Sequence, residues 1–585
     1  MANRLWKIKT AKKSKLGKKY HPLIAQLLAE RGVDSEAEIE NFFKPDYATG
    51  IHDPFLFADM EKAVARIIVA QEKKEKVAIF GDYDADGVTS SALLFQVLEK
   101  FGFVGVEVYI PDRQLEGYGM NVEALNFLHK AGVTLIITVD CGVTNIEEVA
   151  HANALGIDVI VTDHHHAPKV LPAALAIINP HVDGCAYPFK NLAGVGVAFK
   201  LAQALFQKID PKNVDQLKWF LDLVAVGTIA DCVPLLGENR VIVKYGLVVL
   251  SKTRRAGLLE MFKVGRIVID ENNIPDTQKI AFQISPRINA AGRMDHANVA
   301  YNLLIEKNPI LARDMALEVE SKNQERQKVT KEIVREIKII AENSFKDKKL
   351  IFTSNEHWQV GILGLIAGKI ADEFNKPTVI LQKQETEFVG SLRSIPAVNI
   401  IEALEKCSDL LIRFGGHAQA AGVKVAAENI EKFYEKLSQV IEAELQGKDI
   451  TPETEIDTEV TVADINWDLV AEIRKMEPFG EGNEEPIFLL KNMLIDDLRV
   501  VGNGSKHLKL TIRPESGSPA STRGDDRSSM RGGPKMFDAI GFSFGDKFPE
   551  LKKGDKIEIV FNLQEDEWNG NKKIQIRLID LKIVN

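Results

Sequence analysis

One short run of the chain combines a carboxylate with imidazoles directly after an apolar segment. Thr162-Asp163-His164-His165-His166 follows Asp158-Val-Ile-Val161, a run typical of a buried strand. Open α/β sheets bind their ligands where strands end. Neighbouring side chains on an extended segment face opposite ways, so one imidazole can bind a metal while the next meets a substrate. A surface histidine run with no function is the plain alternative.

Four further acidic residues occupy comparable places. Asp82 and Asp84 follow one apolar run, Asp140 follows a second, and Asp231 closes the segment Gly-Thr-Ile-Ala-Asp. Taken singly, each can be explained as an Asx turn or a helix cap. Taken together with the histidines, they predict carboxylates and imidazoles that converge on metal.

Mixed carboxylate and imidazole ligands suit Mn²⁺ or Mg²⁺, with Zn²⁺ as the rival, and the absence of cysteine ligands argues against a structural zinc site. Two such ions about 3.5 to 4 Å apart can activate water and stabilise the entering and leaving oxygens of phosphoryl transfer. The residues therefore predict hydrolysis of a phosphoester or phosphoanhydride.

The composition is that of an ordinary globular chain. It has 585 residues, a formal net charge of -9 and four scattered cysteines without a Cys-x-x-Cys pair. No run approaches the roughly 18 apolar residues of a membrane span, and the N-terminal residues lack an apolar signal core, so we expect a cytoplasmic protein without membrane contact. The acidic balance gives no basic footprint, so any nucleic-acid site must be local.

The hydrophobic pattern predicts an α/β fold class with several domains. Short β-branched runs alternate with amphipathic segments in the first half, which indicates a mainly parallel sheet, and residues 310–343 keep one apolar helical face. Within that helix, residues 321–328 are polar all round, as in a bridge between domains. We predict a helical lead-in (1–50), a catalytic domain with a connecting segment (51–305), a bridging helix (306–346), a second α/β domain (347–447), and a C-terminal β-barrel of the oligonucleotide-binding (OB) type (448–585) with a mobile insertion at 514–535.

The acidic motifs resemble a known group of enzymes. Asp-Tyr-Asp-Ala-Asp-Gly, Val-Asp-Cys-Gly, Asp-His-His and Ala-Asp-Cys-Val-Pro-Leu, in this order, are similar to the motifs of the DHH phosphoesterase superfamily. Longer motifs around Arg113, Arg287, His357 and His417 resemble the RecJ-like single-strand-specific DNA exonucleases. The resemblance implies a two-metal enzyme that degrades single-stranded DNA from 5′ to 3′ into nucleoside 5′-monophosphates, in repair and recombination. It also implies a DHH catalytic domain and a DHH-associated nucleic-acid-binding domain.

The resemblance assigns roles to the acidic and imidazole residues. Asp82 should hold one ion, Asp140 should bridge both, and His165 should contact the scissile phosphate, so that Asp140 and His165 are the catalytic pair. Some relatives carry a histidine four residues before the first aspartate, where this chain has Ala78. The first ion would then have fewer protein ligands than in those relatives. Asp86 is a candidate to support that ion from outside its direct ligands. The second ion should be held by Asp84, His164 and Asp231.

The resemblance also implies a set of DNA contacts. Arginine suits phosphate because its guanidinium donates in two places at once. As alternatives, Arg287 and Arg293 can be ion-paired to acids such as Asp295, and Tyr118 or Trp358 can fill a core instead of stacking on a base. The DNA or phosphate contacts so predicted are Arg113, Tyr118, Arg287, Arg293, Ser391, Arg393, the Gly415-Gly416 loop and His417.

Two other functions compete with the exonuclease. One is hydrolysis of short oligonucleotides or cyclic dinucleotides, which would not need the terminal barrel or the long helix. The other is a non-catalytic replication scaffold, against which the full set of ligands argues. The expected partners are single-stranded DNA and, as further candidates, a helicase and a single-strand-binding protein, with the chain itself a monomer.

Overall fold

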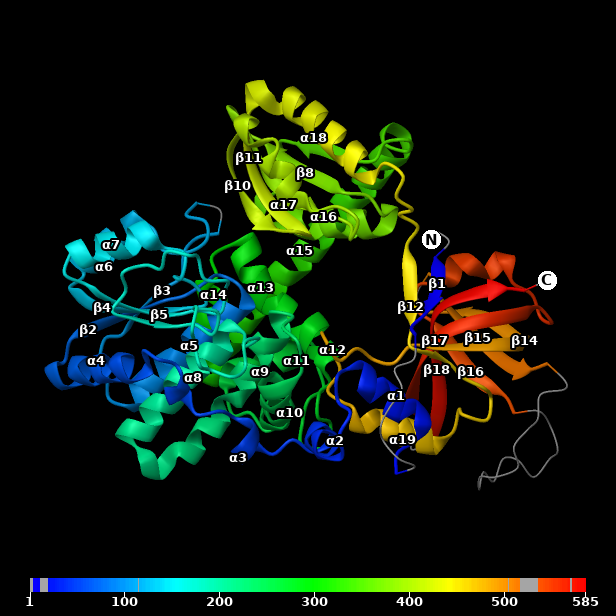
Figure 1. Cartoon of the computed structure of the whole chain (residues 1–585), viewed down its shortest axis with the longest axis horizontal. Coiled ribbons are helices and arrows are strands. Elements are labelled where there is room, and N and C mark those ends of the chain that lie inside the picture. The colour runs from blue at the N-terminus through cyan, green and yellow to red at the C-terminus, as the bar shows by residue number, and fades with distance from the viewer. Residues whose placement is uncertain are drawn as a thin grey trace. The chain divides into compact units, whose positions relative to one another are not determined.

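The computed structural model describes residues 4–10, 19–113, 115–502, 504–515, 535–568 and 571–584 (Figure 1). They form two compact units. The first unit is residues 47–452, and the second combines residues 4–46 with residues 453–585. Across the described ranges, no helix is both long enough and apolar enough to cross a bilayer.

The first unit opens with a parallel sheet of five strands in the order β3-β2-β4-β5-β6. The near-continuous apolar runs of its central strands fit a sheet that is buried on both faces. This confirms the α/β class and the mainly parallel sheet predicted from the sequence. The strands are β2 (Lys76–Phe80), β3 (Glu107–Tyr109), β4 (Val133–Val139), β5 (Asp158–Thr162) and β6 (Ala176–Ile178).

Helices cover both faces of this sheet (Figure 1). Alternate residues of its strands therefore belong to two separate hydrophobic cores. Val77 and Ile79 of β2 belong to one core, and Ala78 and Phe80 belong to the other. The first core is closed by α4 (Met60–Lys73), α5 (Ala85–Lys100) and α8 (Gly194–Ile209), and the second by α6 (Val122–Lys130) and α7 (Ile146–Ala154).

A helical layer follows the sheet and ends in a 36-residue helix, α15 (Pro309–Ser344). This confirms the long helix expected from residues 310–343. Its polar stretch is not solvated on every side, because Asn323 is buried and Lys322 forms an ion pair with Asp295 of the segment after α13 (Ser285–Met294). The stretch packs on its neighbour through charges and hydrogen bonds, which a hydrophobic pattern does not reveal. The layer contains α9 (Leu221–Ala230), α10 (Gly237–Ser251), α11 (Ala256–Val264), α13 (Ser285–Met294) and α14 (Asn298–Ile305).

The second α/β domain is a mixed sheet in the order β10-β11-β9-β8-β7, with only β7 and β8 parallel. Trp358 is 3% exposed and lies in the core beneath α16, so it fills a core and is not placed to stack on a base. The elements are β7 (Ile351–Asn355), α16 (Val360–Phe374), β8 (Thr378–Lys383), β9 (Glu387–Arg393), α17 (Ile400–Glu405), β10 (Leu411–His417), β11 (Ala420–Ala426) and α18 (Ile430–Leu445).

The second unit is built on a ring of strands. β14 pairs with β15 and also with β17, so that β14, β15, β16, β18 and β17 close on themselves. Trp568 pairs with Asn571 in the antiparallel pair of β17 and β18. The two residues between them lie outside the described ranges, as do 516–534 of the expected insertion. The elements are β13 (Thr458–Glu459), α19 (Trp467–Lys475), β14 (Phe488–Val501), β15 (His507–Pro514), β16 (Phe537–Gly541), β17 (Lys556–Trp568) and β18 (Asn571–Ile583).

The N-terminal segment belongs to this second unit, which the sequence did not predict. β1 (Leu5–Ile8) pairs in parallel with β12 (Glu453–Ile456), and α1 (Pro22–Glu30) and α2 (Glu36–Phe43) follow it. The segment is therefore more than a helical lead-in. A four-residue strand whose partner lies some hundreds of residues away carries no local signal. The domain boundaries given above otherwise stay predictions.

Candidate active site

Three acidic residues follow adjacent parallel strands at one edge of the first sheet. Asp82 comes just after β2, Asp140 directly after β4, and Asp163 directly after β5. Because β2, β4 and β5 are neighbours and parallel, their carboxyl ends lie side by side. The chain reverses its winding direction beside β2, which is where such sheets bind ligands.

The first candidate metal group consists of Asp82, Asp84 and Asp140. One carboxylate oxygen of each lies within 4.8 Å of the others. Asp84 has two tasks, because its Oδ1 also caps α5 by accepting from the backbone N–H of Asp86 at 2.8 Å and of Gly87 at 3.1 Å. A Cβ at Gly87 would lie 2.5 Å from the carbonyl oxygen of Asp82, so only glycine allows this tight turn.

The second candidate group consists of Asp86, His164 and Asp231, again with ligand atoms within 4.8 Å of one another. His164 Nε2 lies 3.2 Å from Asp140 Oδ1 and 3.6 Å from Asp231 Oδ2. His164 thus stands between the carboxylate at the end of β4 and the one at the end of α9. A third grouping joins Asp140 and His164 to His165.

Several of these ligand atoms are buried and lack a hydrogen-bond partner in the described structure. A buried polar atom without a partner costs free energy, so its retention calls for an explanation. A divalent cation supplies one, since all of the atoms are oxygens or an imidazole nitrogen. The atoms are Asp82 Oδ1, Asp140 Oδ1, Asp231 Oδ2 and His164 Nε2.

The pKa values of this cluster are shifted because its charged groups are buried close together. Burial, followed by repulsion from neighbouring carboxylates, raises the pKa of Asp82 and of Asp140 well above the usual range. The same causes raise the pKa of Asp231 to about 9. Burial lowers the pKa of His164 to about 4, so the imidazole is neutral and its nitrogen can serve as a ligand. A cation would stabilise the ionised carboxylates.

The backbone around Asp140 is shaped to aim its carboxylate. Asp140 has a φ of 62°, a left-handed conformation that costs energy for a residue other than glycine. A Cβ at Gly194 would overlap the carboxylate of Asp140, so α8 can begin here only with glycine. At the same helix start, the two carboxylate oxygens of Asp86 accept from the N–H of Gly194 at 2.6 Å and of Val195 at 2.9 Å.

Helix α13 fixes the aspartate loop from the other side. Asn289 Oδ1 accepts from the backbone N–H of Ala85 at 2.8 Å, and a Cβ at Gly292 would lie 2.6 Å from the carbonyl oxygen of Tyr83. No role for Asn289 can be predicted from the sequence. Its only signal was its place in the motif between Arg287 and Arg293.

Asp163 orients the histidines instead of joining a metal group. Its Oδ2 accepts from the N–H of Val143 at 2.9 Å, and its Oδ1 accepts from the N–H of His164 at 2.7 Å. His165 Nδ1 lies 2.8 Å from the same Oδ1. Burial works against ionisation of Asp163, but the hydrogen bond and charge of His165 outweigh it and lower the pKa of Asp163. An ionised Asp163 is an acceptor, so His165 Nδ1 carries the proton and Nε2 is left for a substrate.

Three of the predicted phosphate contacts form a cationic cluster beside the carboxylates. The guanidinium of Arg113 lies 4.6 Å from the ring centre of Tyr83, and Arg293 Nη1 donates to the carbonyl oxygen of Gly361 at 3.1 Å. Burial, followed by repulsion from Arg113, lowers the pKa of Arg293 to about 9, and the same two causes lower the pKa of Arg393. Within the described ranges no carboxylate forms an ion pair with these three arginines.

Arg287 differs from them. Its Nε donates to Glu320 Oε2 at 2.6 Å, and its side chain is only 12% exposed. The ion-pairing alternative therefore describes Arg287 better than a phosphate contact, although the partner is Glu320 and not Asp295. Asp295 instead pairs with Lys322 at 2.8 Å.

Other predicted contacts lie in two rows across β9, β11 and β10, and Gly416 lies in the row between these two, paired with Ala421. Ser391 is paired with Gly422, which is paired with Gly415. Arg393 is paired with Ala420, which is paired with His417. Directly paired residues share a face of the sheet. Gly415, Gly416 and His417 therefore belong to an exposed edge strand, where the sequence analysis expected a loop.

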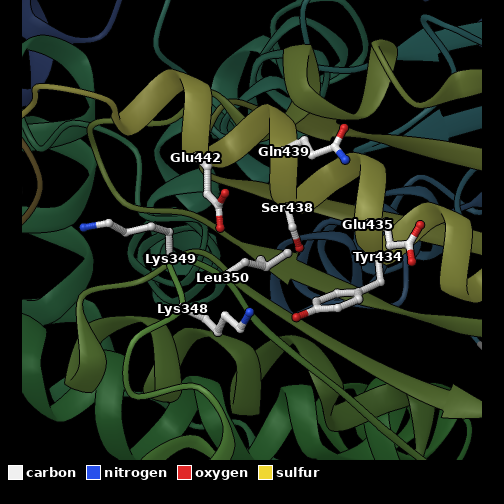
Figure 2. Close-up of a pocket in the computed structure, with 8 residues that line it drawn as sticks. All are labelled: Lys348, Lys349, Leu350, Tyr434, Glu435, Ser438, Gln439 and Glu442. Atoms are coloured by element: carbon white, nitrogen blue, oxygen red, sulfur yellow. The ribbon is translucent and has the colours of Figure 1, made fainter.

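A cavity of about 190 Å³ lies elsewhere on the second α/β domain (Figure 2). Tyr434 and Ser438 of α18 line one side, and Lys348, Lys349 and Leu350 line the other. None of the predicted site residues lines it. We assign it no part in the chemistry.

Comparison with known proteins agrees with this arrangement. Models of the DHH family N-terminal domain, the DHHA1 domain and the RecJ OB domain match residues 76–228, 347–443, and 456–523 with 527–580. The chain is 38% identical to the single-stranded-DNA-specific exonuclease RecJ of Bacillus subtilis, over 96% of this chain and 68% of that protein. It is 31% identical to the Haemophilus influenzae RecJ, over 96% of both chains. The chain belongs to the RecJ family.

A solved structure extends the comparison to the fold. RecJ from Thermus thermophilus, in complex with Mn²⁺, superimposes with a TM-score of 0.80 and 26% identity, covering 99% of this chain and 79% of that one. This RecJ-family chain thus shares the fold of its relatives through both units. The closed ring of strands in the second unit is the region that the OB-domain model matches.

Proposed function

We propose that this chain is a divalent-metal-dependent exonuclease that degrades single-stranded DNA from the 5′ end toward the 3′ end. It releases nucleoside 5′-monophosphates in DNA repair and recombination. The observation that carries the proposal is the set of buried, unpartnered ligand atoms on Asp82, Asp140, His164 and Asp231. Membership of the RecJ family supports the substrate, and the motif resemblance supports the polarity.

The residues fit two divalent cations. Asp82 would hold one ion, Asp84, His164 and Asp231 the other, and Asp140 would bridge them. The ions would supply an activated water and positive charge at the reacting phosphate. Mn²⁺ or Mg²⁺ suits this donor set, and the Thermus relative was crystallised with Mn²⁺. Asp86 is better suited to an outer role, because both of its oxygens are already occupied by the start of α8.

The chain's own groups would hold the DNA beside this centre. His165, kept in one tautomer by Asp163, would contact the scissile phosphate through Nε2. Arg113, Arg293 and Arg393 would bind the terminal phosphate, since a phosphate relieves the repulsion among three guanidinium groups.

The exposed β-strand β10 would guide the DNA away from the metal centre. Glycines let a phosphate approach the backbone closely. Gly415 lies in the same row as Ser391, and Gly416 lies next to His417.

The setting of the enzyme is proposed from the same resemblance. We propose that it acts in the cytoplasm as a monomer, on strands supplied by a helicase and covered by a single-strand-binding protein. The described residues contain no disulfide, which fits a reducing compartment.

One digestion tests reaction, direction and metal together. An oligonucleotide labelled separately at each end, single-stranded or in a duplex, is incubated with Mn²⁺, Mg²⁺ or a chelator. We expect the 5′ label to be released first as a mononucleotide, only from the single strand and only with metal. Release from the 3′ end, equal cleavage of duplex, or activity in chelator would contradict the proposal.

A further inference from the structure

Tyr118 was expected to contact DNA, but its hydroxyl points to a different task. The hydroxyl donates to the backbone carbonyl oxygen of Asp140 at 3.1 Å and lies 3.0 Å from His165 Nδ1. It therefore touches the segments of both proposed catalytic residues. The ring lies edge-on to the His165 imidazole, with 5.5 Å between the ring centres.

The loop around Tyr118 is built to project the side chain inward. Gly117 and Gly119 each have a φ of 84°, a conformation that a side chain would strain. A Cβ at Gly119 would also lie 2.7 Å from Asn145 Oδ1, which accepts from the N–H of Met120. Two left-handed glycines thus turn the chain into and out of the position from which Tyr118 reaches Asp140.

The hydrogen bonds of this network can all be satisfied at once. Asp163 takes the Nδ1 proton of His165, so the single proton of the Tyr118 hydroxyl is left for the carbonyl of Asp140. That carbonyl belongs to the residue whose left-handed backbone aims the bridging carboxylate. The hydroxyl thereby holds the strained peptide of Asp140 in place and limits the movement of the His165 ring.

We propose that Tyr118 is a positioning residue whose hydroxyl fixes the carboxylate of Asp140 and the imidazole of His165 in their working orientations. This rests on the proposed function, because it assumes that Asp140 binds metal and that His165 meets the phosphate. Outer contacts of this kind typically change metal affinity or activity by about 10- to 100-fold when removed.

The alternative is that the ring stacks on a base, and 38% of Tyr118 is indeed exposed. The two roles respond differently to two substitutions. Stacking needs the ring and not the hydroxyl, so Tyr118→Phe would keep it and Tyr118→Ala would lose it. Positioning needs the hydroxyl, so both substitutions would be harmful.

The experiment combines kinetics with metal binding to the full-length protein without DNA. For Tyr118→Phe we expect kcat on 5′-phosphorylated single strands, or the affinity for Mn²⁺ measured by calorimetry, to fall about 10- to 100-fold. KM for DNA should change by less than about 2-fold, since the DNA contacts remain. A Tyr118→Phe variant with unchanged kcat and Mn²⁺ affinity, beside a Tyr118→Ala variant with raised KM, would overturn the proposal in favour of stacking.

Tyr109→Phe is the matched control. It removes a hydroxyl that donates to Glu116 Oε1 at 2.5 Å in the same loop region, but one without contact to Asp140 or His165. We expect it to keep Mn²⁺ affinity and kcat within about 2-fold, and an equal loss in both variants would show that the loop as a whole is responsible. If the wild-type protein cleaves no DNA, the proposed function fails, whereas the Mn²⁺ titration still tests the role of Tyr118.

Discussion

The carboxylate cluster and the arginine cluster are opposite in charge but alike in design. Burial and mutual repulsion raise the pKa of Asp82, Asp140 and Asp231, and the same two effects lower the pKa of Arg293 and Arg393. Each cluster is held in an unfavourable electrostatic state by the fold around it. Each would be relieved by a ligand of opposite charge, for which we propose a divalent cation at the first cluster and a phosphate at the second.

The carboxylate cluster and the predicted DNA contacts on β10 differ in how closely the backbone packs around them. The carboxylates stand at strand and helix ends, with close glycine contacts at Gly87 and Gly194. The predicted DNA contacts of the second α/β domain lie partly on an exposed edge strand, where a Cβ at Gly415 would meet nothing within 4 Å. On the proposed function, chemistry would depend on buried preorganisation, and binding of the DNA strand would depend on an open surface.

The largest expected effect comes from Asp140, the carboxylate proposed to bridge the two ions. Asp140→Asn keeps a residue that tolerates the left-handed backbone but removes the charge between the two ions. We expect kcat in Mn²⁺ to fall by at least about 10³-fold, while affinity for single-stranded DNA stays within about 3-fold. Asp215→Asn, at a residue whose side chain is 90% exposed, is the control and should leave kcat unchanged. Retained turnover in Asp140→Asn would reject the bridging role.

A glycine-to-alanine substitution at Gly194 beside the carboxylate cluster and at Gly415 on the exposed strand gives the next effect. Gly194→Ala places a methyl group on the carboxylate of Asp140, so we expect kcat to fall by at least about 100-fold. Gly415→Ala meets open space, so the fold and kcat should be kept, and only KM should rise, by about 2- to 5-fold. Steady-state kinetics with circular dichroism as a folding check separates the two. A kcat loss for Gly415→Ala, or a change in KM alone for Gly194→Ala, would contradict the difference between the buried carboxylate site and the exposed strand β10.

A conservative change at the arginine cluster should act on binding. Arg393→Lys keeps the charge but loses the planar fork, so we expect KM for a 5′-phosphorylated strand to rise about 10-fold with little change in kcat. A strand with a 5′-hydroxyl should show a smaller difference between variant and wild type. Lys424→Ala, on the same sheet and paired with Glu387, is the control and should leave KM unaltered. Equal KM changes for both strand ends would argue against a terminal-phosphate contact.

The sequence predicted the parallel sheet and the long helix well, because local periodicity and strand-end motifs mark them. It also placed Asp82, Asp84, Asp140, His164 and Asp231 in one candidate site. In the structure these residues fall into groups that share Asp140 and His164, with Asp86 instead of Asp84 beside His164 and Asp231. Their roles in catalysis remain predictions until the variants above are measured.

What the sequence could not show depends on contacts between distant segments. Asp86 accepts from residues more than a hundred positions away, and the hydroxyl of Tyr118 meets Asp140 and His165 across two loops. β1 likewise finds its partner β12 at the other end of the chain. The buried ion pair of Arg287 was foreseen only as an alternative, since an arginine in a motif has the same appearance whether it faces an acid or a phosphate.

The smallest expected effect tests whether the raised pKa values of the carboxylates are what a bound cation relieves. Without metal, the native state holds protons on Asp86 and Asp231, whose pKa values are raised to about 7 and about 9, whereas the unfolded chain releases them near pH 4. Stability without metal must therefore fall as pH rises toward 9. His164, with its pKa lowered to about 4, acts in the opposite direction, but its contribution is complete above about pH 7.

Melting curves between pH 7 and pH 9, with and without Mn²⁺, test the carboxylates. Burial works against the charged form of His165, but Asp163 raises its pKa, so His165 acts in the same direction near the lower end of this window. We expect Tm in chelator to fall by about 3 °C across this window, and Mn²⁺ both to raise Tm and to remove most of that slope, because the bound carboxylates are already ionised. The Asp231→Asn variant should lose part of the slope in chelator, since it cannot release the proton. If the slope is the same with and without Mn²⁺, the raised carboxylates are not the groups that the metal relieves, and the symmetry between the two clusters does not hold.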